Sequence, residues 1–280
     1  MRNMAFNGLR LPRLGGMRGG GAAEFNYAAY GTPTFWMDAN YLNGTSPTAS
    51  TNAVDDAVTE WRSRQGASAP FYRQATGAAK PLLARASGGD WSLSTGTSAF
   101  TFGSGSMDQV RHFRLWTDAG GQLTADLVDT HSFLLIYAAG ASPVKRNIYG
   151  KDDTGVNLQI GVGGSSRPTV VGTPTVWGNS LTGGDALAGN DWYVIEADLR
   201  STGTSTLRVN GVSVATYTGT QGAVNVDVAL AGRAATTDVR TLGGQLALSL
   251  TYNTTGGYLS SGNRADVSTE FMRRRTAIKA

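Results

Sequence analysis

Four stretches of the chain alternate apolar side chains with polar or small ones. Successive side chains of a β-strand point to opposite faces, so this period of two predicts strands with one face in a core and one polar face. A helix would instead repeat its apolar positions every three to four residues. The apolar positions are Val156, Leu158, Ile160 and Val162; Tyr193, Ile195, Ala197 and Leu199; Val224, Val226, Val228 and Leu230; and Leu246, Leu248, Leu250 and Tyr252.

Two further patterns add a buried strand and a hairpin. Residues 133–137 are apolar throughout, which predicts a central strand buried on both faces, although periodicity alone also permits a short buried helix. Asn210 and Gly211 both tolerate a positive φ and lie between two short apolar runs, so residues 207–214 predict a β-hairpin. Thr169–Val171 is a candidate strand inside a long stretch rich in glycine and serine.

The last segment predicts a helix over residues 259–275. Ser260 and Ser261 are suitable caps at its start, and Val267 and Phe271 lie four residues apart on one face. Arg273–Arg275 suit the negative end of a helix dipole. We therefore expect a capped helix with a solvated basic end, and we favour this interpretation over a nucleic-acid patch.

The composition agrees with an all-β domain. Glycine accounts for 38 of 280 residues and charged residues for only 16%, which suits short strands joined by many turns. The length is within the range of one large sandwich, and the absence of cysteine excludes disulfides and thiolate metal sites. The longest apolar stretch is far shorter than a membrane helix, and arginines interrupt the place of a signal peptide's apolar segment. We expect a soluble, unexported chain.

Basic charge is concentrated at the two ends of the chain. Residues 1–23 are rich in glycine and contain Arg2, Arg10, Arg13 and Arg18 without any acidic residue. Residues 24–270 contain sixteen basic and twenty acidic side chains, so this body is net acidic and a nucleic-acid-binding face on it is disfavoured. An arm with so few apolar residues has little to bury on its own. We predict that it anchors the chain to an acidic groove of a partner protein.

The order of several short motifs resembles a known family. Trp36-Met37-Asp38-Ala39, Trp61-Arg62 before Gly66, and Gln74-Ala75 before Lys80-Pro81 are similar to the opening of concanavalin A-like, laminin G-like domains of bacteriophage structural proteins. The far end matches as well, through Asp191–Ile195, the hairpin, Gly243–Leu246 and the closing helix. Similar domains often carry a Phe-Asp-Gly-type strand after the proline, whereas this chain has Asp90–Ser94.

The resemblance implies a jelly-roll sandwich of two antiparallel sheets, in agreement with the alternating strands. The expected organisation is an extended basic arm over residues 1–23, a jelly-roll sandwich over 24–258, and a helix with a basic tail packed on the sandwich over 259–280. Fold alone does not define activity, so the candidate residues are considered separately.

Glu196 and Asp198 are the candidates for catalysis. Glycoside hydrolases on similar jelly rolls carry Glu-x-Asp-x-x-Glu on one strand, but the third acidic position here is Ser201. Retaining hydrolysis needs both a nucleophile and a separate acid, and this motif lacks one of them. We therefore favour two polar residues on the wet face of a strand over a catalytic pair.

The candidates for metal binding are also few. His112 and His131 have no carboxylate at a recognisable ligand spacing, so both are interpreted as structural. Asp152, Asp153 and Asn157 offer oxygen ligands for calcium near a turn, although their spacing does not match a known loop. Solvated turn residues are the favoured interpretation, and no cofactor is expected.

Glycan binding requires an exposed aromatic ring beside hydrogen-bonding groups. Trp177, Asn179 and Asp185 in the glycine-rich stretch fit this description, as do Trp116 and Asp118. Tryptophans in a sandwich more often belong to the core, so this interpretation competes with a structural one.

These observations predict a bacteriophage virion protein, attached to capsid or tail by its arm and able to contact host-surface glycans. Its expected partners are other virion proteins and further copies of itself, without nucleic acid or membrane. The alternatives are a glycan-degrading hydrolase on the same scaffold and a decoration or adaptor protein without a ligand.

Overall fold

The computed structural model describes the greater part of the chain, in segments that contain the strands and helices. For several strands the description covers the backbone and its pairing but not the side chains. The described residues are 24–48, 53–66, 69–74, 80–86, 88–94, 113–116, 124–126, 129–138, 142–150, 157–162, 169–171, 181–182, 187–220, 225–227, 229–230, 244–253 and 259–280.

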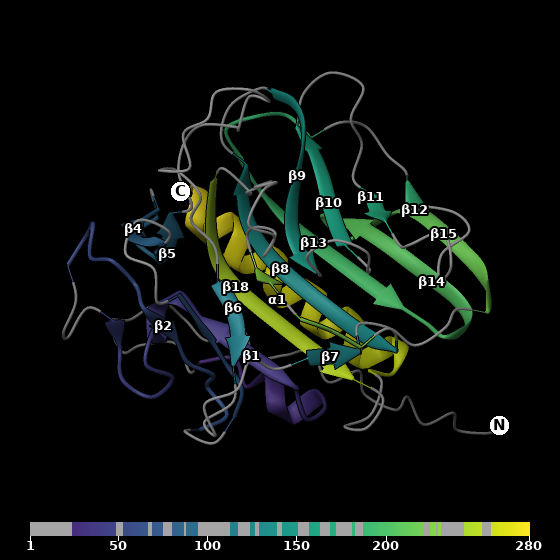
Figure 1. The fold of residues 1–280 in the computed structure, drawn as a ribbon, viewed down its shortest axis with the longest axis horizontal. Coiled ribbons are helices and arrows are strands. Elements are labelled where there is room, and N and C mark those ends of the chain that lie inside the picture. Colours follow the sequence, from purple (N-terminus) through teal and green to yellow (C-terminus); the bar gives the residue numbers. More distant parts are fainter. Residues whose placement is uncertain are drawn as a thin grey trace, which may run out of the picture.

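Two antiparallel sheets form a jelly-roll sandwich (Figure 1). The first, called sheet A, has the strand order β15-β14-β13-β8-β18-β5-β4, and β1 also pairs with β18. Its strands are β1 (Phe35–Asp38), β4 (Leu82–Arg85), β5 (Trp91–Ser94), β8 (Thr130–Ala138), β13 (Asp191–Leu199), β14 (Thr202–Val209), β15 (Val212–Thr220) and β18 (Gly244–Asn253).

The second sheet, called sheet B, has the order β12-β11-β10-β9-β17-β6-β3-β2. A separate pair joins β7 to β16. The strands of sheet B are β2 (Glu60–Trp61), β3 (Phe71–Arg73), β6 (Phe113–Trp116), β9 (Ser142–Gly150), β10 (Asn157–Val162), β11 (Thr169–Val171), β12 (Leu181–Thr182) and β17 (Ala229–Leu230), and those of the pair are β7 (Thr124–Asp126) and β16 (Asn225–Asp227).

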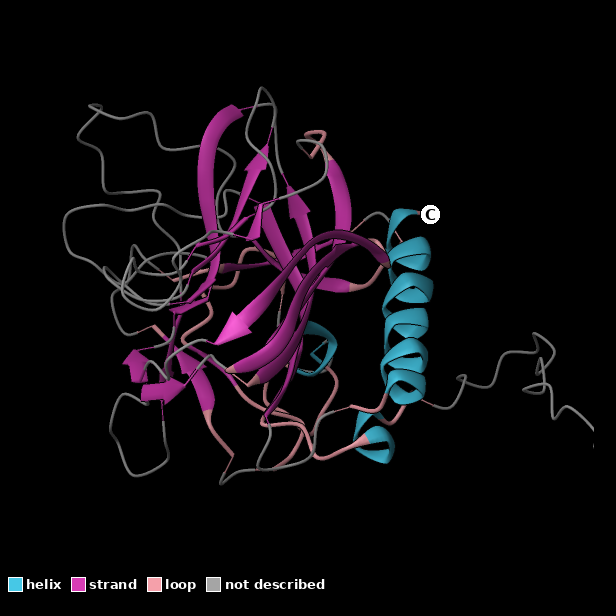
Figure 2. Ribbon diagram, turned by 90° about the vertical axis from the view of Figure 1, so that its right-hand side faces the viewer, coloured by secondary structure: helices cyan, strands magenta, loops and turns pink. Residues whose placement is uncertain are grey.

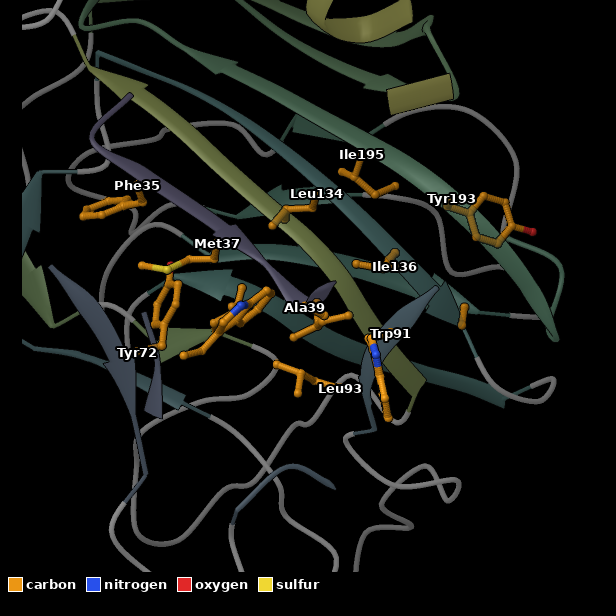
Figure 3. Close-up of a cluster of buried hydrophobic side chains, with 14 of the residues drawn as sticks. Phe35, Met37, Ala39, Tyr72, Trp91, Leu93, Leu134, Ile136, Tyr193 and Ile195 are labelled. Atoms are coloured by element: carbon orange, nitrogen blue, oxygen red, sulfur yellow. The ribbon is translucent and has the colours of Figure 1, made fainter. Parts of the chain in front are cut away.

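The core between the sheets is formed by one face of each strand. Strands β1, β8 and β13 of sheet A contribute Met37, Ile136 and Ile195 to the same cluster as Tyr72 of sheet B, and Met37 lies beside Tyr72 (Figure 3). Met37, Tyr72, Ile136 and Ile195 are fully buried. Burying an aliphatic or aromatic side chain of this size contributes on the order of 2 kcal/mol, so this layer contributes strongly to stability.

Sheet A is also buried on its other face, because helix α1 (Ser261–Lys279) lies along it (Figure 2). The Ser260 hydroxyl accepts a hydrogen bond from the Asn263 backbone N–H at 3.1 Å and caps the helix. Val267, Phe271 and Ile278 recur at helical spacing and pack on Phe133 and other apolar residues of the sheet. Two short 3₁₀ helices, Tyr27–Tyr30 and Ala39–Tyr41, flank β1.

Several predicted elements are confirmed. The all-β jelly-roll sandwich with a C-terminal helix is observed, and residues 133–137 lie in the central strand β8 with neighbours on both sides. The hairpin is formed by β14 and β15, with Asn210 and Gly211 at φ values of 50° and 79°. Thr169–Val171 is strand β11.

One predicted strand is divided in the structure. The alternating residues 224–230 contain β16, which pairs with β7, and β17, which pairs with β6 and β9. An alternating pattern identifies which residues face a core but not which neighbour each of them pairs with, so it does not reveal that the strand changes partner.

Candidate functional site

A buried ionic cluster lies on the face of sheet A that α1 covers. Along β13, Trp192, Val194, Glu196 and Asp198 point toward this face, since Tyr193, Ile195 and Ala197 belong to the core between the sheets. The prediction that Glu196 and Asp198 lie on a solvated face is wrong. Both side chains are buried, Glu196 beneath Arg264 of α1 and Asp198 beside Arg200.

Glu196 is at the centre of the cluster and is only 1% exposed. Its Oε1 accepts hydrogen bonds from His131 Nε2 at 2.9 Å and from Arg208 Nη1 at 2.7 Å. Arg264 Nη1 lies 3.4 Å from both carboxylate oxygens. The three partners come from β8, β14 and the first turns of α1, so one carboxylate joins two strands to the helix.

The surroundings of Glu196 keep it ionised. Burial by itself would raise the pKa of its carboxyl, but the hydrogen bond from His131 and the charges of Arg208 and Arg264 outweigh burial and lower the pKa. A general acid of a glycoside hydrolase needs a raised pKa, and a nucleophile needs access to the substrate. Glu196 has neither property in this arrangement.

His131 completes the cluster from the neighbouring strand. The ring is 1% exposed and stacks on Phe133 with a centroid distance of 4.6 Å. Its Nδ1 is buried without a hydrogen-bond partner, whereas Nε2 lies beside Glu196. A proton on Nδ1 would be a buried donor without a partner, whereas a proton on Nε2 is donated to the Glu196 carboxylate. This arrangement agrees with the structural role expected for His131.

Asp198 belongs to a different contact. Its carboxylate accepts hydrogen bonds from Arg200 Nε at 2.8 Å and from Arg200 Nη2 at 3.1 Å, which is a two-point guanidinium pairing. The partners of Glu196 are on β8, β14 and α1, while Arg200 lies two residues after Asp198 in the chain. The two acidic residues share a strand face but take part in separate ion pairs.

A second ionic cluster fixes the other end of α1. Arg274 is 8% exposed, and its guanidinium contacts the buried Asp38 carboxylate at 2.5 and 3.2 Å. Asp90 lies 3.7 Å away on the same guanidinium. Burial alone would lower the pKa of Arg274, but the charge and hydrogen bonds of Asp38 raise it above its ordinary value. This cluster connects α1 to β1 and to the loop before β5.

The prediction of a solvated basic helix end is confirmed for Arg273, whose side chain is 65% exposed, and is wrong for Arg274, which is buried. The helix continues to Lys279, so Arg273–Arg275 lie one turn before its end. Arg273 pairs with Glu270 at 2.6 Å, and Arg275 donates to the Trp192 carbonyl at 2.5 Å. Lys279 and Arg275 both reach Asp191, at 2.6 and 3.3 Å. Glu270 on the helix itself and the distant Asp38 and Asp191 of sheet A pair with the basic residues at this end of the chain.

Sequence reasoning missed the partners of both clusters. Glu196 lies directly opposite Arg208 in the β13–β14 pairing and diagonal to His131 across β8, so the register of sheet A places these side chains together. The opposite charges of Glu196 and Arg208 at paired positions of neighbouring strands are the sequence signal that indicates this ion pair. Nothing local in the sequence connects Asp38 with Arg274.

The other predicted site residues lie outside the described side chains. Trp116 is in β6 and Asn157 in β10, where the backbone alone is described. The remaining candidates lie outside the described residues altogether, namely Trp177, Asn179, Asp185, Asp118, Asp152, Asp153, His112, Arg2, Arg10, Arg13 and Arg18. These predictions stay predictions.

Two further properties concern the described part of the chain alone. Its residues contain no group of three or more histidine, aspartate or glutamate side chains placed to hold a metal ion. None of the described helices has the length and apolar character required to cross a bilayer.

No protein-family model matches the sequence, and no curated protein matches it. Similar solved structures include Trypanosoma rangeli sialidase in complex with sialic acid, with 10% identity, a TM-score of 0.49, and coverage of 89% of this chain and 34% of that chain. The receptor-binding domain of botulinum neurotoxin D has 12% identity, a TM-score of 0.48, and coverage of 79% and 52%.

A third similar structure is domain 4 of AbnA, an extracellular arabinanase from Geobacillus stearothermophilus, in complex with arabinotriose. It has 15% identity, a TM-score of 0.43, and coverage of 85% of this chain and 99% of that domain. The chain spans about a third of the length of the sialidases that it resembles. At such identities the resemblance concerns the arrangement of strands, and no activity or ligand is inferred from it. The fold defines the class of this protein as a jelly-roll sandwich domain with a docked C-terminal helix.

Proposed function

We propose that this chain is a non-catalytic structural protein of a virion, attached to the particle through its N-terminal arm. The observation that carries the proposal is the distribution of positive charge. The basic residues near the C-terminus are neutralised within the domain, since Arg273, Arg274 and Arg275 all contact acidic side chains. Residues 1–23 contain four arginines and no acidic residue to neutralise them.

The buried acidic residues support a structural role rather than hydrolysis. Glu196 and Asp38 each hold α1 against sheet A, and the sandwich uses them to fix its own layers. An arm rich in arginine and glycine suits an acidic protein groove, because guanidinium groups form two-point contacts with carboxylates. A bacteriophage particle is the setting that the resemblance of the sequence motifs implies.

The experiment compares three forms of the chain in assembly with purified particles. Deletion of residues 1–23 is expected to abolish incorporation, and replacement of Arg2, Arg10, Arg13 and Arg18 by glutamine is expected to reduce it strongly. The matched control replaces the same arginines by lysine. It is expected to retain more incorporation than the glutamine variant, because the positive charge remains, but less than the natural chain, because the two-point geometry is lost. Normal copy numbers with the deleted form would contradict anchoring by the arm.

Contact with a host glycan is a separable part of the proposal. Trp177→Ala and Trp116→Ala are expected to reduce adsorption of particles to host cells, whereas Trp177→Tyr keeps an aromatic ring and is expected to retain part of it. Unchanged adsorption with both alanine variants would remove the glycan from the proposal and leave the structural role in place.

A further inference from the structure

Strand β15 forms one edge of sheet A and lies at the rim of the sandwich in Figure 1. It is nine residues long and contains no charged residue and no proline. An edge strand presents a row of backbone N–H and C=O groups that can pair with another strand, and proteins usually protect long edges with charges, prolines or a covering loop.

The opposite edge of sheet A is covered in this way. Strand β4 is short, follows Pro81 and ends with Arg85. The chain segment before β2 lies along it, because the Asp55 N–H donates to the Leu83 carbonyl at 2.7 Å and the Leu83 N–H donates to the Asp56 carbonyl at 2.9 Å. The fold thus uses its own chain to satisfy one edge of the sheet.

Within the described residues, no strand pairs with the outer side of β15. The backbone of β15 pairs with β14. Strand β12 of sheet B lies close to β15, but the backbone of β12 pairs with β11. The start of the strand is open to solvent, with Val212 65% exposed, and Thr216 and Thr218 are exposed further along. Val212 is one of two exposed large hydrophobic side chains in the described part of the chain.

We propose that two copies of this chain pair β15 with β15 in antiparallel orientation about a twofold axis, which joins two sheets A into one continuous sheet. A twofold axis places a strand against itself, so any charge on the strand would face a like charge or lie close to it. Strand β15 is neutral along its whole length, and self-pairing therefore brings no repulsion. A charged partner strand would find no complementary charge on this edge.

The side chains of β15 are compatible with pairing to a second copy of the same strand. Thr216 and Thr218 lie opposite Thr206 and Thr204 in the β14–β15 pairing, and the Thr204 and Thr218 hydroxyl oxygens are 2.8 Å apart. Threonine favours strands and forms cross-strand hydroxyl contacts, so a second β15 extends the same threonine pattern across the interface. The proposal concerns the free protein and does not depend on its role in a particle.

The first test is the molar mass of the purified full chain in solution, measured by light scattering over a range of concentrations. The expected result is a dimer that dissociates on dilution. Thr216→Lys with Thr218→Lys places charges on the paired edge and is expected to give a monomer. Thr202→Lys with Thr204→Lys adds the same charge to the same face of β14, one strand away from the edge, and is expected to remain a dimer. Thermal unfolding of both variants confirms that they fold.

The second test uses the absence of cysteine from the chain. Single cysteines at Ser213, Thr216 and Thr218 are introduced in turn, and oxidation is expected to link two copies at the position nearest the twofold axis, where Cβ atoms lie close enough for a disulfide. A cysteine at Thr204 serves as the control and is expected to stay unlinked. A monomeric full chain, or linking at Thr204 as readily as on β15, would overturn the proposal.

Discussion

Glu196 illustrates how much a single side chain can hold together in this fold. One carboxylate with 1% exposure contacts a histidine and two arginines from three different elements. Removing one partner of a buried ion pair leaves the others without compensation, and this costs far more than the pair contributes at a surface. The role of Glu196 is therefore best examined through stability.

The substitution Glu196→Gln is expected to lower the free energy of unfolding by about 3 kcal/mol, because Arg208 and Arg264 lose the charge that they face. Urea denaturation measures this change. The matched control is Glu60→Gln at the half-exposed pair with Arg62, where a loss of at most about 1 kcal/mol is expected. Equal effects at the two positions would contradict the structural role of Glu196.

The lowered pKa of Glu196 also predicts a dependence on pH. The folded state favours the ionised carboxylate more than the unfolded state does, so this contribution is fully present above the ordinary pKa of 4.5. It is lost as the pH falls through the lower pKa of the folded state. The difference in unfolding free energy between the natural chain and Glu196→Gln is thus expected to be constant near neutral pH and to shrink in acid. Urea denaturation over a pH series measures it, and a difference that grows in acid would contradict this account.

At the scale of elements, α1 depends on charges inside its buried face. Val267, Phe271 and Ile278 supply the apolar contacts, while Arg274 lies in the same stripe and pairs with Asp38. The pair fixes which residues of α1 face β1. If the helix docked in another position, the buried Asp38 carboxylate would lose its partner, and burying an unpaired charge is costly. Apolar burial holds the helix on the sheet, and the ion pair sets its position.

The substitution Arg274→Met is expected to cost about 3 to 5 kcal/mol of unfolding free energy, since it leaves the Asp38 carboxylate buried and unpaired. The control is Lys279→Met on the same helix, where the lysine is 40% exposed and Asp191 keeps Arg275 as a partner. That change is expected to cost less than about 1 kcal/mol. Combining Arg274→Met with Asp38→Asn should recover part of the loss, and the absence of any recovery would argue against the pair as its cause.

The substitution Gly88→Ala tests the contact at the end of the helix. The Gly88 N–H donates to the Ile278 carbonyl at 3.1 Å, and a Cβ atom at position 88 would collide with the Ala277 carbonyl oxygen. Alanine is therefore expected to lower stability by about 1 to 3 kcal/mol, as measured by thermal unfolding. Gly66→Ala is not a matched control because its φ of 115° is itself unfavourable for alanine. Gly262→Ala near the start of α1 is suitable, because its nearest atom is 4.0 Å away, and it should be neutral or stabilising.

The elements themselves are largely predictable from the sequence, and their assembly is not. The hairpin, β8, β13 and the start of α1 follow from local signals such as Asn210-Gly211 and the Ser260 cap. Whether a polar face of a strand meets water depends on what covers it, and nothing near Glu196 in sequence indicates that Arg264 of a helix lies above it. The sequence therefore predicts the shared strand face of Glu196 and Asp198 correctly, but not the buried environment of that face.

At the scale of the whole molecule, α1 makes sheet A the middle layer of a three-layer arrangement. Sheet B covers one face and the helix covers the other, so Phe133, Leu135 and Val194 lose contact with water only when the helix is docked. An exposed apolar patch of this kind leads to aggregation.

Deletion of residues 259–280 is accordingly expected to give insoluble or aggregated protein. Deletion of residues 1–23 is expected to leave the thermal unfolding temperature nearly unchanged, because the arm is predicted to bind outside this domain. Expression followed by light scattering and calorimetry compares the two truncated chains. A soluble, monodisperse chain without residues 259–280 would contradict the role given to α1.

The pairing of β1 with β18 brings Phe35 opposite Thr251, near the two ends of the domain. Strand β18 also lies beside β8 and β5, so the centre of sheet A remains incomplete until residues 244–253 have been synthesised. Contacts between such distant parts of a chain form slowly, because a long loop must close before they are made. The nascent chain must therefore be kept from aggregating until β18 and α1 have emerged from the ribosome.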